Sequence, residues 1–347
     1  MKYRKLGRTG IVVSAIGFGT WGIGKGGWVG AEDEVSIRAL KVARDLGINF
    51  FDTALAYGDG HSERLMAQVF GKSEEVSIAS KVPPKNTACQ ARPGTPLQQV
   101  FPREHVFACL DKTLRNLRRE AIDLYQFHVW SDHWARDSEW QEMVQEIRRS
   151  GKARFIGISI NDHQPTNVLR ALDTGLVDTV QVIYNLFDQS PADELFPFCQ
   201  NYDIGVIVRV PLDEGGLTGR ITPDTTFPPD DLRNRYFAGN RKKQVWERVQ
   251  HLASEAAVSL HELPQLALQF CLAPIAVSTV IPGMRTPGHV RSNVAALDND
   301  PVPEALLVRL RRHRWTRNFY SPSLPEQLRY FYFVPFSEKL KIIRRRL

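Results

Sequence analysis

Short apolar runs and amphipathic stretches alternate along the whole chain. Most of the apolar runs are solidly apolar rather than alternating, which is typical of parallel strands buried on both faces. The stretches between them carry apolar residues at helical spacing. Eight runs are predicted as strands, over residues 15–19, 49–53, 76–81, 122–128, 155–159, 179–184, 205–210 and 277–282.

Helices with readable ends lie between these strands. The spacing predicts a helix over residues 33–46 that stops at Gly47, and a second helix that has Ser62 as its N-cap and ends at Gly71. Residues 103–119 also place one apolar stripe on a helix. A further helix before Gly151 has the stripe Trp140, Met143, Val144 and Ile147.

Eight strands that are each followed by a helical stretch predict an α/β fold of the (β/α)₈ barrel (TIM barrel) type, with a doubly wound open sheet as the rival. Residues 3–13, with a turn at Gly7–Thr9 and Gly10, predict an N-terminal β-hairpin that plugs the barrel bottom. We expect a single domain over residues 1–347, in which about 298–347 form a C-terminal extension. Residues 83–102 and 213–240 are long irregular segments that follow strands, so both should rise over the C-terminal mouth.

Composition narrows the class of protein only slightly. The formal charge of +7 over 347 residues attracts anions without specifying them, and much of it lies in basic runs near the C-terminus. The four cysteines include no CxxC pair, so we expect no metal site. Residues 1–20 lack the apolar core of a signal peptide, and no apolar run is long enough to span a bilayer. These features predict a cytoplasmic protein.

One glycine motif near the N-terminus imitates a dinucleotide fingerprint. Gly22-Ile23-Gly24-Lys25-Gly26-Gly27 satisfies GxGxxG, and Asp52 follows at roughly the acidic spacing. A true fingerprint turns directly into its helix, whereas Trp28-Val29-Gly30-Ala31 intervenes here. We therefore favour a plain loop over a Rossmann dehydrogenase, which remains the third hypothesis for function.

The ends of the predicted strands carry the chemistry, because reactive side chains of such barrels lie at the C-terminal ends of strands. Asp52, Lys81 and His128 end three successive strands, and Tyr57 follows Asp52 by one short loop. Reduction of a carbonyl needs a hydride on carbon and a proton on oxygen. Tyr57 can supply that proton if an ammonium lowers its pKa, and Asp52 can keep a buried Lys81 charged. His128 can donate to the substrate oxygen.

These residues stand in motifs that resemble the aldo-keto reductase family over nearly the whole chain. The motifs are Gly17-Phe18-Gly19-Thr20-Trp21, Phe51-Asp52-Thr53-Ala54 with Tyr57-Gly58, Ser80-Lys81, Asp123-Leu124-Tyr125 through His128, Gly157-Ile158-Ser159, and Ile281-Pro282-Gly283 through Asn293. The resemblance implies a catalytic tetrad of Asp52, Tyr57, Lys81 and His128. It also implies NADPH, or less readily NADH, bound without a Rossmann fold.

The resemblance further implies cofactor contacts at matching positions. Gly19, Thr20 and Asp52 would line the nicotinamide, Ser159 and Gln181 would hold its carboxamide, and Arg209 replaces an aromatic residue under the ring. The diphosphate, the adenosine and its 2′-phosphate would meet Pro211, Leu212, Gly216, Leu217, Gly283, Arg285, His289 and Asn293. Ile160 intervenes where an Asn often follows Ser159, so that Asn161 comes one position late, and Ser292 replaces an acidic residue near the adenine.

The function predicted from this set is an NADP-dependent oxidoreductase that reversibly reduces an aldehyde, ketone or sugar carbonyl, with Tyr57 as general acid. Its substrate pocket would be built from Trp21, Trp28 and Trp130. The alternative is a cofactor-loaded regulatory barrel with little turnover, as in potassium-channel β subunits. We expect a small-molecule carbonyl partner and neither nucleic acid nor membrane, and leave the oligomeric state open.

Overall fold

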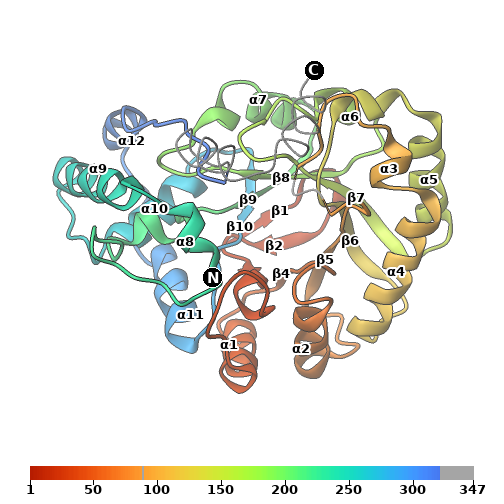
Figure 1. The fold of residues 1–347 in the computed structure, drawn as a ribbon, viewed down its shortest axis with the longest axis horizontal. Coiled ribbons are helices and arrows are strands. Elements are labelled where there is room, and N and C mark those ends of the chain that lie inside the picture. The colour runs from red at the N-terminus through yellow and green to blue at the C-terminus, as the bar shows by residue number, and fades with distance from the viewer. Residues whose placement is uncertain (88–89, 321–347) are drawn as a thin grey trace, which may run out of the picture.

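Eight parallel strands form one curled sheet in the computed structural model, which describes residues 1–87 and 90–320 (Figure 1). Neighbours in the sheet are neighbours in the chain, in the order β10-β9-β8-β7-β6-β5-β4-β3. The strands are β3 (Phe18–Gly19), β4 (Phe50–Asp52), β5 (Ser77–Val82), β6 (Ile122–Phe127), β7 (Ala153–Ser159), β8 (Thr179–Ile183), β9 (Gly205–Arg209) and β10 (Val277–Val280).

The first and last strands meet and close the sheet. Parallel bridges join Ile16 to Val280 and Gly19 to Gly283. The hydroxyl of Thr279 donates to the carbonyl of Ser14 across the same seam, at 2.9 Å. A doubly wound sheet reverses its strand order and keeps two open edges. The sequential order and the closed seam therefore confirm the predicted barrel and overturn its rival.

Helices surround the strands (Figure 1). Helix α1 (Asp33–Asp45) buries Ser36, Ala39, Leu40 and Ala43, which recur at helical spacing. The others are α2 (His61–Phe70), α3 (Leu97–Val100), α4 (Arg103–Leu117), α5 (Ser138–Arg149), α6 (Leu169–Asp173), α7 (Leu195–Asn201), α8 (Leu232–Tyr236), α9 (Arg241–Ala256), α10 (Leu263–Leu272), α11 (Pro287–Val294) and α12 (Glu304–Arg311). None of the helices among the described residues combines the length and apolarity that crossing a membrane requires.

Ser62 does not have the role that the sequence predicts for it. The N-cap of α2 is Gly60, in a left-handed conformation, and Ser62 is the second residue of the helix. Its buried hydroxyl lies 2.6 Å from that of Thr53. This serine therefore joins α2 to the end of β4 rather than satisfying the free N–H groups at the start of the helix.

The N-terminal hairpin closes the bottom of the barrel, as predicted. Strands β1 (Tyr3–Lys5) and β2 (Val12–Ser14) pair antiparallel around the turn at Gly7–Thr9. Leu6 is fully buried in a separate apolar cluster, which also contains Val13, Phe50, Ala79, Leu124, Ile207 and Ile281. The Arg4 guanidinium donates to the carbonyls of Val277 and Leu272, at 2.7 and 2.8 Å, and so anchors the hairpin beside β10.

The chain after α12 returns toward the loops that follow β8 and β9. The backbone N–H of Trp315 donates to the carbonyl of Phe187 at 2.8 Å. The predicted C-terminal extension is described as far as Tyr320. Its basic tail and the aromatic run Tyr330-Phe331-Tyr332-Phe333 lie outside the described residues.

Candidate active site

Lys81 is the centre of a polar cluster at the C-terminal ends of the strands. Its ammonium group donates to Asp52 Oδ1 at 2.5 Å, to the carbonyl of Thr53 at 2.8 Å and to the phenol oxygen of Tyr57 at 3.2 Å. His128 follows β6 directly, and its ring lies edge-on to that of Tyr57, with 5.8 Å between centroids. The structure thus brings together all four residues that the sequence proposed as catalytic.

The second oxygen of Asp52 is held by two amides. Oδ2 accepts from Gln181 Nε2 at 2.7 Å and from Gln126 Nε2 at 3.1 Å. Because both carboxylate oxygens are engaged, Asp52 can face Lys81 in only one orientation. Gln126 is a site residue that the sequence reasoning missed. The available signal was a polar residue inside the apolar strand β6.

The environment determines which groups carry charge. Burial raises the pKa of Tyr57 above its usual value, and this outweighs the opposing effect of the Lys81 ammonium. Burial acts to lower the pKa of Lys81, but Asp52 and Tyr57 raise it on balance. Burial, and then the charges of Lys81 and Arg209, hold the pKa of His128 well below its usual value. Near neutral pH the cluster therefore contains a phenol, an ammonium and a neutral imidazole.

This result corrects one step of the sequence argument. Lys81 was expected to lower the pKa of Tyr57 below that of free tyrosine. The ammonium does act in that direction, but the loss of hydration is the larger effect. The pKa of Tyr57 is therefore above that of free tyrosine, although Lys81 keeps it lower than burial alone would.

Of the three predicted pocket tryptophans, Trp21 lies beside Tyr57 and Trp28 lies beside Trp21. The ring of Trp21 stacks on that of Tyr57 at 6.3 Å, and Trp28 meets Trp21 edge-on at 6.3 Å. Trp130 lies elsewhere. It is 0% exposed and packs against Phe127, Trp134 and Trp140 in the core. A side chain so enclosed offers no surface to a substrate, so Trp130 belongs to the core under the loop after β6 and not to the lining of a pocket.

The residues expected around the nicotinamide come from two pairs of neighbouring strands, β3 with β4 and β7 with β8. Ser159 and Gln181 are register partners of β7 and β8, and the Thr20 hydroxyl donates to the carbonyl of Asp52 at 3.0 Å. The Gln181 amide is already engaged with Asp52. Asn161 is committed elsewhere, because its side chain bonds the backbone of Ala91 through both N–H and carbonyl.

Arg209 ends β9 beside this group. Its guanidinium donates to Asp162 Oδ1 at 2.6 Å and to the carbonyl of Ile160 at 3.0 Å. Its Nε is buried without a hydrogen-bond partner. The positive charge is thus balanced by Asp162 while one donor is left unused at the rim of the site.

A group of basic side chains lies at the start of α11. Thr286 caps this helix by accepting from the N–H of His289 at 3.2 Å. Arg285 Nη1 donates to the carbonyl of Val29 at 2.7 Å. The pKa of Arg285 is lowered mainly by burial and secondly by the charge of Arg233. The pKa of His289 is lowered mainly by burial and secondly by the charges of Arg285 and Arg220. Sequence reasoning named Arg285 and His289 but missed Arg220 and Arg233.

The remaining predicted cofactor residues lie in the loop after β9, at the seam and in α11. Pro211, Leu212, Gly216 and Leu217 belong to the loop after β9, in which Leu217 is fully buried. A Cβ added to Gly216 would approach Asp213 Oδ2 to 2.5 Å, so the loop needs a glycine there. Gly283 faces open space at the seam beside Gly19, and Asn293 is buried in α11.

The glycine motif at Gly22–Gly27 opens no helix. A short 3₁₀ turn, Trp21–Ile23, includes its first two residues, and α1 begins only at Asp33. A Cβ on Gly24 would lie 2.8 Å from the Cβ of Tyr57. These glycines therefore allow a loop to pack closely against the Tyr57 backbone, which is a role unrelated to a dinucleotide fold. No cluster of three or more metal-binding side chains occurs among residues 1–87 and 90–320.

Comparison with known proteins gives one consistent result. The model of the Aldo/keto reductase family matches residues 15–313. Aldo-keto reductase YhdN of Bacillus subtilis is 32% identical over 84% of this chain and 87% of its own length. The NADH-specific methylglyoxal reductase of Escherichia coli is 30% identical over 86% and 94%. The structure of a glycerol dehydrogenase from Gluconobacter oxydans matches with a TM-score of 0.70 at 25% identity, over 90% of this chain and 94% of that one.

Proposed function

Since this chain belongs to the aldo/keto reductase family and is therefore an NAD(P)H-dependent oxidoreductase, we propose that it reversibly reduces an aldehyde, ketone or sugar carbonyl with NADPH, and that Tyr57 is the general acid. The observation that carries the proposal is the bond from the buried Lys81 ammonium to the Tyr57 phenol oxygen, at 3.2 Å, with His128 alongside. A cytoplasmic location stays a prediction.

Each residue of the cluster has a distinct task in this reaction. Tyr57 donates its phenolic proton to the carbonyl oxygen, and Lys81 stabilises the phenolate that remains. Asp52 keeps Lys81 charged inside the barrel, because an unpaired buried ammonium would lose its proton. His128 is neutral and can donate one hydrogen bond to the same carbonyl oxygen. The nicotinamide, when bound and reduced, supplies the hydride to the carbonyl carbon.

The residues present fit a phosphorylated dinucleotide. The diphosphate and the 2′-phosphate are anions, and Arg285 and Arg220 lie near His289, whereas the charge of the neighbouring Arg233 is already paired with Asp231 at 2.8 Å. Gly283 leaves open space at the seam between β3 and β10. We propose that Arg285 and His289 hold the adenosine end and that Arg209, Ser159 and Gln181 border the nicotinamide. The substrate would then lie against Trp21 and Trp28.

Replacement of Tyr57 by Phe tests the general-acid role. We expect purified protein to oxidise NADPH with a simple aldehyde, and Tyr57→Phe to lower kcat about 100-fold or more while NADPH still binds, because only the proton donor is lost. Tyr202→Phe is the matched control, since Tyr202 is 53% exposed on the surface. Wild-type turnover in Tyr57→Phe would contradict the role assigned to Tyr57.

The same assay shows whether NADPH or NADH is the preferred cofactor, and whether the protein is an enzyme or a regulatory barrel with little turnover. Comparison of kcat/KM for NADPH and NADH should favour NADPH by about tenfold or more if the arginine cluster binds the extra phosphate. A preference for NADH would overturn that part of the proposal. Tight NADPH binding without turnover over a broad set of carbonyls would instead favour the cofactor-loaded regulatory barrel.

A further inference from the structure

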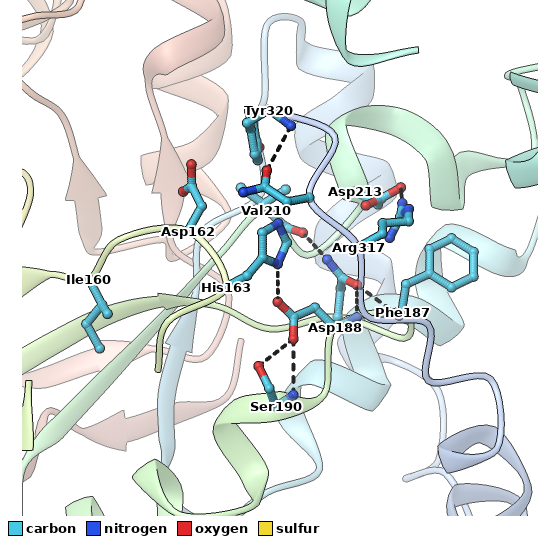
Figure 2. A network of polar contacts seen from close by, with 12 residues as sticks. Ile160, Asp162, His163, Phe187, Asp188, Ser190, Val210, Asp213, Arg317 and Tyr320 are labelled. Carbon is cyan, nitrogen blue, oxygen red and sulfur yellow. Dashed lines mark hydrogen bonds and ion pairs between the residues drawn. The ribbon is translucent and has the colours of Figure 1, made fainter. Parts of the chain in front are cut away.

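The C-terminal strap, defined here as residues 315–320, lies against the loop that follows β9 (Figure 2). Figure 2 shows Arg317 of the strap pointing toward Asp213, and the Tyr320 ring above Val210. The strap is anchored at its start by the bond from the Trp315 N–H to the Phe187 carbonyl. Two segments about 100 residues apart in sequence therefore meet beside the proposed cofactor site, as the Arg317–Asp213 bond shows.

Arg317 makes the principal contact. Its guanidinium donates to Asp213 Oδ2, and both side chains are buried. It also stacks on the rings of Trp315 and Phe319, at 4.2 and 4.4 Å from their centroids. Tyr236 donates to the other oxygen of Asp213 at 2.9 Å. Asp213 is thus held from two sides, once by the strap and once by α8.

Tyr320 makes the second contact. Its phenol donates to the Glu214 carboxylate, which is buried next to Asp213. Glu214 and Asp213 are consecutive acidic residues in a loop proposed to receive an anion. Without a positive charge beside it, the Asp213 carboxylate would repel a diphosphate. Arg317 balances the charge of Asp213, and Tyr320 supplies a donor to Glu214.

The loop itself has an uncommon backbone. Val210, Asp213 and Glu214 have φ values of 54°, 52° and 53°, in the left-handed region that favours glycine. Such a conformation persists where neighbouring structure holds it. Asn185 donates to the Val210 carbonyl at 3.0 Å, and the strap holds the side chains of the other two.

We infer that Arg317 and Tyr320 are positioning residues for cofactor binding: they hold the side chains of Asp213 and Glu214 so that the loop 210–219 has the shape needed to receive the cofactor diphosphate, and Arg317 also balances the charge of Asp213. This inference rests on the proposed function and on the expectation from the family resemblance that Pro211, Leu212, Gly216 and Leu217 contact the cofactor diphosphate. Arg317 and Tyr320 act through the loop and need not contact the cofactor.

Replacement of Arg317 by Met tests the inference on the full chain. We expect Arg317→Met to raise the Kd and the KM for NADPH about tenfold or more, while kcat at saturating NADPH changes by less than about threefold. The split arises because the catalytic cluster is untouched once the loop is closed on its ligand. A change that was merely structural would lower the melting temperature without raising the Kd of the protein that remains folded.

Arg314→Met is the matched control. Arg314 precedes the strap and also pairs with an aspartate, Asp193, but these side chains are 40% and 53% exposed and lie away from the loop. We expect its Kd for NADPH to stay within about twofold of the wild type. An equal rise in both variants would overturn the inference, because it would reflect general loosening of the C-terminal segment.

Tyr320→Phe removes only the hydroxyl group and decides the matter if Arg317→Met does not fold. It should raise the Kd for NADPH about threefold or more, because Glu214 loses its donor. An unchanged Kd in this variant would overturn the inference for Tyr320, and an unchanged Kd in a folded Arg317→Met would overturn it for Arg317. Wild-type protein is titrated first, since failure of the wild type to bind NADPH contradicts the proposed function itself.

Discussion

Lys81 shows how one buried charge can organise a whole site. Its ammonium group has three acceptors within 3.2 Å, and two of them are the side chains of Asp52 and Tyr57. A buried ion pair of this kind adds little net stability, because desolvation of both charges offsets their attraction. What the pair supplies is a fixed ammonium next to a phenol whose pKa burial has raised. Near neutral pH the site therefore holds a phenol beside a fixed ammonium, as the proposed general-acid role of Tyr57 requires.

Glu214 is a second buried group whose protonation has a measurable consequence. Burial raises its pKa to about 7, against 4.5 for an ordinary glutamate, although the Tyr320 phenol acts to lower it. Between these values the folded protein binds a proton that the unfolded chain does not. The contribution of Glu214 to the free energy of unfolding is thus largest below pH 4.5 and is lost as the pH rises to 7. Above pH 7 the free energy of unfolding is lower by on the order of 3 kcal/mol.

Replacement of Glu214 by Gln should remove this pH-dependent cost. We expect Glu214→Gln to be more stable than the wild type by about 1–3 kcal/mol at pH 8, and the advantage to shrink at pH 5, where the wild-type carboxyl is already neutral. Urea denaturation of the cofactor-free protein at both pH values measures the difference. Glu247→Gln, at an exposed position, should show no such trend. An advantage that is equal at both pH values would contradict the titration of Glu214.

Among the elements, the loop at Gly22–Gly27 shows why a motif must be judged by its context. Its GxGxxG pattern matched a fingerprint, yet the missing helix predicted a plain loop, and the structure confirms this. Its contact with Tyr57 was not predictable, because Gly24 meets that residue through a close backbone approach. A Cβ at Gly24 would lie 2.8 Å from the Tyr57 Cβ, and sequence spacing carries no signal of such an approach.

Gly24→Ala should therefore act on catalysis. We expect it to displace Tyr57 and lower kcat about 10-fold to 100-fold, while the Kd for NADPH stays within about twofold. Gly26→Ala is the control, because its added Cβ would meet the Gly58 nitrogen at an ordinary 3.4 Å. Steady-state kinetics with a cofactor titration separates the two effects. Loss of cofactor binding with an unchanged kcat would count against the packing role of Gly24.

The elements also show how far the sequence alone can predict the fold. The eight strands lie within a few residues of the predicted runs, because parallel strands buried on both faces leave a strong apolar signal. Asp52, Lys81 and His128 could be placed together, since a barrel brings the ends of its strands to one rim. The position of Trp130 could not be predicted, because an aromatic residue after a strand packs equally well in the core or at the mouth of the barrel.

The ion pairs that join segments distant in sequence could not be predicted either. The contacts of Arg317 with Asp213 and of Arg209 with Asp162 depend on where loops cross. No local period or cap signals such a crossing. Sequence reasoning placed the candidate catalytic cluster together but missed Gln126, Arg220 and Arg233, which are single polar residues whose contacts appear only when their neighbours in space are known.

At the scale of the whole molecule, the two ends of the barrel have separate tasks. The polar cluster lies at the C-terminal ends of the strands, and the hairpin closes the opposite end around Leu6. In barrels of this type, substitutions at the bottom affect stability and those at the top affect activity.

Leu6→Ala should demonstrate this separation. Leu6 is fully buried, so we expect a loss of about 2–5 kcal/mol in the free energy of unfolding, with kcat/KM within about twofold of the wild type below the melting transition. Val12→Ala, in the same hairpin at a position 52% exposed, should change stability by less than about 0.5 kcal/mol. Urea denaturation and steady-state assays measure the two quantities. A parallel loss of activity in Leu6→Ala would contradict the separation.

The seam between β3 and β10 also has a consequence for synthesis. The bond from Thr279 to Ser14 spans 265 positions, so the barrel cannot close until nearly all of the described chain has left the ribosome. Until then the growing sheet presents an unpaired first strand and a succession of unpaired last strands, which are surfaces prone to aggregation. Its many non-local contacts also imply slow folding. We therefore expect the nascent chain to depend on chaperones for much of its translation, and to bind cofactor only after release.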